Sequence, residues 1–166
     1  MARDDCRVLL GMKFIVDANV GKLAKWLRLL GHDAVFFEGK DDGEMVAAAL
    51  ADERVILTRD THLMEWGVIR SGRVKAVLIQ EDDPAAQIRQ VVRDLNLGSQ
   101  PRPFTICLEC NSLLLEIAKA DVKERVPPYV FKTQEQFMEC PKCHRVYWRG
   151  THWQAMLEKL ARLTGG

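Results

Sequence analysis

Short apolar runs that alternate with helical segments are the feature that most constrains how this chain can fold. Each run is four or five residues long and is followed by polar residues and then by a segment with helical periodicity. Short buried strands separated by helices predict a parallel sheet covered by helices on both faces, which is an α/β fold. We expect strands at residues 13–16, 34–37, 54–57 and 75–79.

The helices between these strands have recognisable beginnings. The first is expected over residues 22–30. The second opens on the adjacent acids Asp41 and Asp42, and either side chain could cap it. The helix after the fourth strand opens on Asp83, which is followed by a proline at its first position. A short helical turn is also expected over residues 61–66.

The composition changes at "GSQPRP", residues 98–103, and we place a domain boundary there. After it, the apolar residues from Trp153 to Leu160 follow helical spacing and predict a helix with one buried face. The regions expected are therefore a leader over residues 1–11, an α/β domain over residues 12–100, a cysteine-containing region over residues 104–153 and a C-terminal helix over residues 154–166.

Four cysteines in the second half form two C-x2-C pairs separated by 29 residues. The pairs are Cys107 with Cys110 and Cys140 with Cys143. Four thiolates at this spacing suit a structural zinc site, whose tetrahedral geometry leaves no open position for catalysis. A redox C-x-x-C pair and structural disulfides are the alternatives. His144 follows the last cysteine directly, and we expect it to be a bystander and not a ligand.

Carboxylates stand where the first and third expected strands end. Asp17 follows the first strand and Asp60 follows the third. Functional groups in open parallel sheets gather beyond the carboxyl ends of the strands. Asp42 is expected at the same edge, at the start of a helix, with Glu44 one turn inward. Carboxylates gathered in this way repel one another unless a hard cation such as Mg²⁺ or Mn²⁺ lies between them, and such a site suits metal-assisted hydrolysis of phosphodiesters.

Each of these acids also has a purely structural explanation. Asp17, together with Asn19, could cap the first helix, and Asp60 could cap the turn after the third strand. The shared edge of the sheet, and not any single residue, favours a metal site over separate caps.

Basic side chains accompany the acids. Lys22, Lys25 and Arg28 recur at three-residue spacing, on what should be the solvent side of the first helix. Arg59 directly precedes Asp60. Cations in these places could hold a phosphate backbone without reading bases. Simple solvation of an exposed helix face is the alternative.

No apolar stretch approaches the roughly 20 residues that a membrane span needs, and the apolar residues 8–10 are too few for the core of a signal peptide. We therefore expect a cytoplasmic protein with no membrane partner. The net charge of +1 does not by itself select a partner.

Several segments together resemble one known family. "KFIVDANVGKLAKWLRLLGHDAVFF", "DDGEMVAAA" and "VILTRDTHL" resemble the PIN-like ribonucleases of the Mut-seven C-terminal RNase domain family. "CLECN", "RVPPYVF" and "CPKCHRVYWRGTHW" are similar to the zinc ribbon at the end of that family, and the resemblance runs from about Met12 to Trp153. It implies a PIN-like, three-layer α/β/α domain with a parallel sheet of four or five strands, followed by a small zinc ribbon and a C-terminal helix.

The resemblance also implies a metal-dependent ribonuclease that acts on single-stranded RNA, with catalytic Mg²⁺ or Mn²⁺ and structural Zn²⁺. It places the family's first acid on Asp17 and a later acid, in a T-x-D setting, on Asp60. The acid between them is Asp42, with Glu44 as the alternate. Asp82 is the candidate for a fourth acid.

Two other functions compete with the ribonuclease. One is a non-catalytic RNA- or protein-binding module that acts through the ribbon, where "YWRGTHW" supplies aromatic and basic residues able to stack on bases. The other is a receiver-like phospho-acceptor domain, which also has acids at strand ends. This second reading is disfavoured because the four cysteines would have no role in it.

Overall fold

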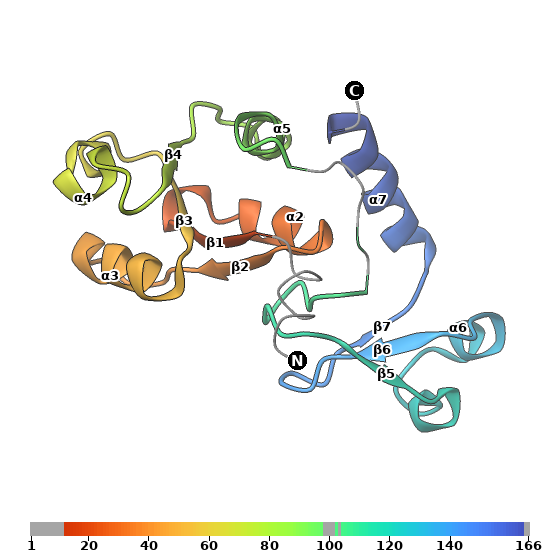
Figure 1. Cartoon of the computed structure of the whole chain (residues 1–166). Coiled ribbons are helices and arrows are strands. Elements are labelled where there is room, and N and C mark those ends of the chain that lie inside the picture. Colours follow the sequence, from red (N-terminus) through yellow and green to blue (C-terminus); the bar gives the residue numbers. More distant parts are fainter. Residues whose placement is uncertain (1–11, 98–101, 103, 165–166) are drawn as a thin grey trace.

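The computed structural model describes residues 12–97, 102 and 104–164, and Figure 1 traces their arrangement. The predicted leader (residues 1–11) and the predicted boundary segment (residues 98–103, except residue 102) lie outside the described residues. The elements of the first part are β1 (Lys13–Val16), η1 (Ala18–Val20), α2 (Leu23–Leu29), β2 (Asp33–Phe36), α3 (Asp42–Asp52), β3 (Val55–Thr58), η2 (Leu63–Glu65), α4 (Gly67–Arg70), β4 (Ala76–Leu78) and α5 (Pro84–Asp94). The second part contains β5 (Leu115–Ile117), η3 (Lys119–Val122), α6 (Pro128–Thr133), β6 (Phe137–Glu139), β7 (Val146–Tyr147) and α7 (Thr151–Thr164).

The first four strands form one parallel sheet in the order β2-β1-β3-β4, as the alternating pattern predicts. Ile15 in β1 pairs with Val35 in β2 on one side and with Ile56 in β3 on the other. β1 and β3 are therefore neighbours at the centre of the sheet. Whatever follows these two strands must emerge side by side at the same edge.

Successive residues of the central strands point to opposite faces of the sheet, because the side chains of a strand alternate. Phe14 and Val16 belong to a buried cluster with residues of α2 and α5, whereas Ile15 belongs to a second cluster with residues of α3 and α4. In Figure 1, α3 and α4 lie to one side of the sheet and α5 lies to the other. The three-layer α/β/α arrangement is confirmed.

The second part of the chain contains a separate antiparallel sheet in the order β5-β6-β7. Its own apolar cluster is small and is formed by the buried side chains of Val122, Val126 and Phe137, with a few partly buried neighbours. We call residues 104–147 the ribbon. So small a core stabilises a fold only weakly, so the ribbon depends on other contacts.

Those contacts are made with the α/β body, because the main core continues into the ribbon and α7. Cys107, Cys140 and Tyr147 are buried in the same cluster as Leu27 of α2. The helix α7 packs beside α5, and its Trp153 is buried against that cluster. The apolar face predicted between Trp153 and Leu160 is confirmed, since both side chains are buried.

The prediction that Arg28 lies on the solvent side of its helix is wrong. Its side chain is only 7% exposed. It donates hydrogen bonds to the carbonyl of Ala34 at 3.0 Å and to the carbonyl of Leu108, in the ribbon, at 2.6 Å. A buried guanidinium is tolerated when its donors are satisfied, so Arg28 joins the body to the ribbon.

A second polar junction lies beside it. Asn111 of the ribbon donates to the carboxylate of Asp33 at 2.6 Å and accepts a hydrogen bond from the backbone of Ala34 at 2.9 Å. Arg54 holds the same carboxylate from the other side with two hydrogen bonds, of 2.8 and 3.2 Å. Body and ribbon therefore share both apolar and charged contacts.

The C-terminal helix begins at Thr151, three residues before the predicted start at residue 154. α7 is amphipathic, and its exposed positions are polar residues, charged residues and two alanines. Among the described residues, no helix combines the length and the apolar character needed to cross a membrane.

Candidate metal centres

The four cysteines of the two C-x2-C pairs meet in one cluster. Their sulfur atoms all lie within 4.8 Å of one another, and the Sγ atoms of Cys107 and Cys143 are 3.8 Å apart. A tetrahedral site with Zn–S bonds of about 2.3 Å requires sulfur atoms roughly 3.8 Å apart. The cluster can therefore hold a metal such as zinc, and the donor set fits the ion that the sequence predicts.

The two pairs are built in the same way. In each, the amide of the second cysteine donates to the sulfur of the first at 3.4 Å. The residue after the second cysteine, Asn111 or His144, donates its amide to the carbonyl of the first cysteine, at 3.0 and 2.9 Å. Asn111 and His144 also both have left-handed backbones, with φ of 62° and 61°. The matched turns aim both sulfurs of each pair at the same point.

The neighbouring thiols act on the pKa of one member of the cluster, Cys110. A hydrogen bond with Cys143, burial and the neighbouring thiols raise the pKa of Cys110 to about 12. A bound divalent cation reverses this effect, because ligating sulfur must lose its proton. Metal binding at this cluster is therefore coupled to proton release.

Residues around the cluster fix its orientation. The hydroxyl of Tyr147 lies 3.1 Å from the sulfur of Cys107 and accepts a hydrogen bond from the backbone of Leu108 at 3.2 Å. The ring of His144 instead contacts Glu139 at 3.0 Å. This placement supports the prediction that His144 is a bystander.

At the sheet edge, Asp17 is held in two ways at once. Its backbone extends β1, donating to the carbonyl of Leu57 in β3 at 3.0 Å. One carboxylate oxygen accepts from the amide of Ala18 at 2.8 Å and caps the turn η1. The other oxygen accepts from the hydroxyl of Thr58 at 2.7 Å. Capping and membership of a shared site are therefore compatible.

The buried hydroxyl of Thr58 connects the two strand-end acids. It donates to Asp17 and accepts a hydrogen bond from the amide of Asp60 at 3.0 Å. Asp60 in turn accepts from the amide of His62 at 2.9 Å. Thr58 was not singled out as a site residue from the sequence, although the T-x-D pattern carried the signal.

The structure resolves which of the two adjacent acids caps α3. Asp41 accepts from the amide of Gly43 at 2.7 Å and is the cap, which frees the side chain of Asp42. Burial raises the pKa of Asp42, and the carboxylates of Asp60, Asp17 and Asp41 and a hydrogen bond with Asp60 raise it further. The three predicted acids Asp17, Asp42 and Asp60 are therefore near neighbours. We call these three the acid edge.

Glu44 lies in the first turn of α3 and is exposed. The carboxylates that raise the pKa of Asp42 most are those of Asp60, Asp17 and Asp41, and not that of Glu44. Between the two alternatives for the middle acid, this arrangement favours Asp42.

The acid edge is looser than the thiolate cluster. Over the described ranges, only the four cysteines form a group of three or more potential ligands whose atoms all lie within 4.8 Å of one another. Mg²⁺ retains several water ligands when it binds and needs only one or two carboxylates directly, so a looser set of oxygens suits it.

The predicted cations have different surroundings. Arg59 forms an ion pair with Asp82 at 2.5 Å, and Lys25 forms one with Glu109 of the ribbon at 2.8 Å. Lys22 is exposed and lies two residues after the end of η1. Asp82 is the candidate fourth acid. Its ion pair with Arg59 places it near the residue that precedes Asp60, and its side chain is 90% exposed.

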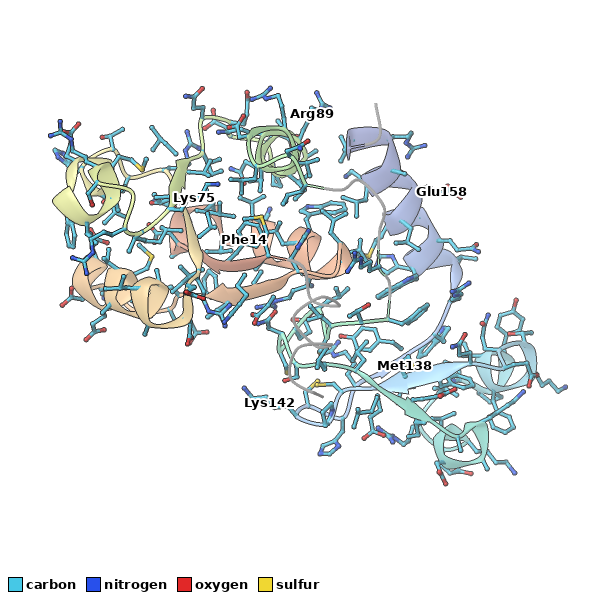
Figure 2. The ribbon with its side chains drawn as sticks, in the orientation of Figure 1. Phe14, Lys75, Arg89, Met138, Lys142 and Glu158 are labelled. Atoms are coloured by element: carbon cyan, nitrogen blue, oxygen red, sulfur yellow. The ribbon has the colours of Figure 1, made fainter. Side chains whose placement is uncertain are left out.

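An open groove of about 1010 Å³ begins at η1, next to Asp17, and runs along α2 to the first cysteine pair. Lys142 of the second cysteine pair closes its far end, and Figure 2 shows this lysine at the end of the ribbon opposite α6. The exposed polar and aromatic side chains lining the groove include Asn19, Lys22, Lys25, Phe36, Glu109 and Lys142. The groove therefore extends from Ala18 and Asn19, which follow Asp17 in the chain, to Cys110 of the thiolate cluster, although none of the three acids lines it.

A protein-family model described as the Mut7-C RNAse domain matches residues 12–160. The match covers both the acid edge and the thiolate cluster. No curated protein and no solved structure matches the chain.

Proposed function

This chain belongs to the Mut7-C RNase domain family, and from that membership we propose that it is a metal-dependent ribonuclease that hydrolyses phosphodiester bonds of single-stranded RNA. The family assignment indicates a ribonuclease-type function. The metal dependence, the site residues and the preference for single strands are our proposals.

The observation that carries the proposal is the meeting of three acids from different parts of the chain. Asp17 and Asp60 lie close enough to Asp42 for their charges to raise its pKa, and the charged groups that act most strongly on it are all carboxylates. Such repulsion is relieved when a divalent cation shares the carboxylates. The residues therefore fit Mg²⁺ or Mn²⁺, with oxygen ligands only.

In this proposal Asp17 and Asp60 hold the ion, and Asp42 completes the set from α3. A bound Mg²⁺ or Mn²⁺ supplies charge stabilisation for the attacking and leaving oxygens of the phosphodiester. Thr58 keeps both strand-end carboxylates in place through its two hydrogen bonds. Lys22 lines the groove, where it can contact the phosphate backbone.

The direct test is cleavage of a labelled single-stranded RNA by Asp17→Asn and Asp60→Asn, with Asp121→Asn as a matched control on the exposed turn η3. Each acid-edge variant should lose activity by about 100-fold or more, because metal stabilisation of the transition state contributes several kcal/mol. Asp121→Asn should cleave like the wild type.

Cleavage that both acid-edge variants retain would refute the assignment. If, in addition, the wild type shows no metal-stimulated cleavage and RNA binding is lost in Cys107→Ser but kept in Asp60→Asn, the non-catalytic binding module is the correct function.

A further inference from the structure

A second pocket, of about 620 Å³, lies between the ribbon and the first turn of α7. We call it the ribbon pocket. It is not an isolated hollow, because Lys25, Leu108 and Glu109 line both this pocket and the groove that begins at η1, directly after Asp17 in the chain. The ion pair between Lys25 and Glu109 therefore marks the passage from one to the other.

The balance of charge differs between the two spaces. The groove is lined by four lysine or arginine side chains and three carboxylates, with Arg28 and Lys25 already engaged in other contacts. The ribbon pocket is lined by three such cations against one carboxylate, Glu109, and also by two histidines. Two of these cations are engaged as well, Lys25 with Glu109 and Arg125 with Glu139. The excess of cations over carboxylates in the lining nevertheless favours a polyanion, because phosphate contacts provide most of the affinity of nucleic-acid binding.

The ribbon pocket also offers aromatic surface. Trp148 is partly exposed there, and it lies so close to Gly150 that a Cβ added at this glycine would stand 3.0 Å from the indole nitrogen. The ring of Trp153 also borders the pocket, but it is buried and stacked on Phe104, so Trp148 is the ring that a base can reach. The buried Nε1 of Trp153 has no hydrogen-bond acceptor among the described residues. Aromatic rings beside cations are the combination that binds single-stranded nucleic acid, through stacking of bases and contacts to phosphates.

We propose that the ribbon pocket is a second binding subsite for the RNA strand that is cleaved at the acid edge, and that the strand reaches it along the groove. This inference rests on the proposed ribonuclease function. It gives the ribbon a role in substrate binding beyond its structural metal: short RNAs occupy the acid edge and groove alone, and longer RNAs also fill the ribbon pocket. Arg145 on the ribbon and His152 on α7 contact the strand from opposite sides.

The experiment measures cleavage and binding of unstructured RNA oligomers over a series of lengths from roughly 4 to 16 nucleotides, the range of known single-strand site sizes. The variants are Arg145→Gln and His152→Ala. Arg162→Gln is the matched control for Arg145→Gln, since Arg162 is exposed in the last turn of α7 and does not line the pocket. Zinc content is measured for every variant, because Arg145 lies near Cys143.

The wild type should show a drop in KM once the oligomer is long enough to reach the ribbon pocket. Arg145→Gln should raise KM for those longer oligomers on the order of tenfold, the loss expected for one hydrogen bond to a charged group, and should leave kcat unchanged. The same variant should leave short oligomers unaffected and reduce the logarithmic salt dependence of binding by about 0.7 for each lost phosphate contact. His152→Ala should show the same length dependence, and Arg162→Gln should behave like the wild type at all lengths.

A KM that is equally affected at every length, or at none, in zinc-loaded Arg145→Gln and His152→Ala would overturn the subsite while leaving the ribonuclease intact. Absence of cleavage by the wild type, with binding that still depends on length and on Arg145, would instead refute the proposed function and support the subsite. If the wild type shows neither cleavage nor length-dependent binding, the proposed ribonuclease function and the subsite are both overturned.

Discussion

The two candidate metal centres of this protein differ in how their ligands are brought together. The thiolate cluster takes its ligands from two short turns, each of which places two sulfurs through local hydrogen bonds. The acid edge takes Asp17, Asp42 and Asp60 from the ends of two strands and the start of a helix. Local turns produce a tight cluster, whereas a sheet edge produces a looser set of oxygens that leaves room for water and substrate.

The two centres also have different relations to the core. Cys107 and Cys140 are fully buried and belong to the apolar cluster shared by the body and the ribbon. The three acids are only partly buried and stand where the core ends. Removing a metal should therefore destabilise the fold at the first centre and affect chemistry at the second, and the predictions that follow test this contrast.

The largest effect is expected from loss of the thiolate metal. Binding of structural zinc contributes on the order of 10 kcal/mol in small zinc peptides, which is comparable to the whole stability of a domain. Cys107→Ser, or chelation of the wild type, should unfold the ribbon and lower the urea midpoint of the chain as a whole, because the core is continuous. Unfolding followed by tryptophan fluorescence, together with zinc release, measures both. The fifth cysteine of the sequence, Cys6, lies outside the two C-x2-C pairs, so Cys6→Ser is the control for loss of a thiol. An unchanged midpoint after chelation would contradict this role.

A smaller effect is expected at the junction of body and ribbon. Asp33→Asn weakens charged hydrogen bonds to Arg54 and Asn111, so the free energy of unfolding should fall by about 1.5–3 kcal/mol at neutral pH. Asp52→Asn is the matched control, since Asp52 approaches Arg54 only at 3.5 Å and its side chain is 59% exposed. Its cost should stay within about 0.5 kcal/mol.

The same junction gives a pH dependence of defined sign. Burial by itself raises the pKa of Asp33, but the hydrogen bonds from Arg54 and Asn111 outweigh it and hold the pKa below its ordinary value. The stability contributed by this carboxylate is thus present above its unfolded pKa of about 3.9 and is lost as the pH falls through the lower folded value. Urea unfolding between pH 3 and 7 measures this. The free energies of unfolding of the wild type and of Asp33→Asn should approach each other only at the acidic end of the range. A difference in free energy of unfolding that stays constant over this range would show that the ionised carboxylate of Asp33 does not stabilise the junction.

The smallest effect on stability is expected at the acid edge. Asp42 has a raised pKa, so its contribution is present below the unfolded value of about 3.9 and is lost as the pH rises through the folded value. Without divalent ions, Asp42→Asn should therefore leave the free energy of unfolding at pH 7 unchanged or raise it by less than about 1 kcal/mol. Urea unfolding in metal-free buffer measures this, and a marked loss of stability would mean that Asp42 is a structural acid.

The contrast between ligands placed by local turns and ligands placed by a sheet edge also explains how much of each site the sequence could predict. The thiolate cluster follows from the C-x2-C spacing itself, because two intervening residues confine both sulfurs of a pair to one turn. The acid edge required one further step, the inference that β1 and β3 belong to one parallel sheet, and the short apolar runs supplied it. The adjacency of these strands was not visible in the sequence, and it is what brings Asp17 and Asp60 together through Thr58.

The contacts that sequence reasoning missed join residues far apart in the chain. The spacing of Arg28 suggested an exposed helix face, but its partner is a carbonyl 80 positions later. The domain boundary predicted at residues 98–103 stays a prediction, and the buried core contains residues from both sides of it. Helical periodicity describes one element at a time and carries no information about what is packed against it.

The most direct test of the account is a Mn²⁺ titration of the zinc-loaded protein in which ion binding, read by electron paramagnetic resonance, and RNA cleavage are measured together for the wild type and Asp42→Asn. We predict that wild-type cleavage rises in step with Mn²⁺ occupancy and that Asp42→Asn loses both while keeping its zinc. Cleavage that proceeds without a divalent ion, or Mn²⁺ binding that is unchanged in Asp42→Asn, would contradict the assignment of the acid edge as the catalytic centre.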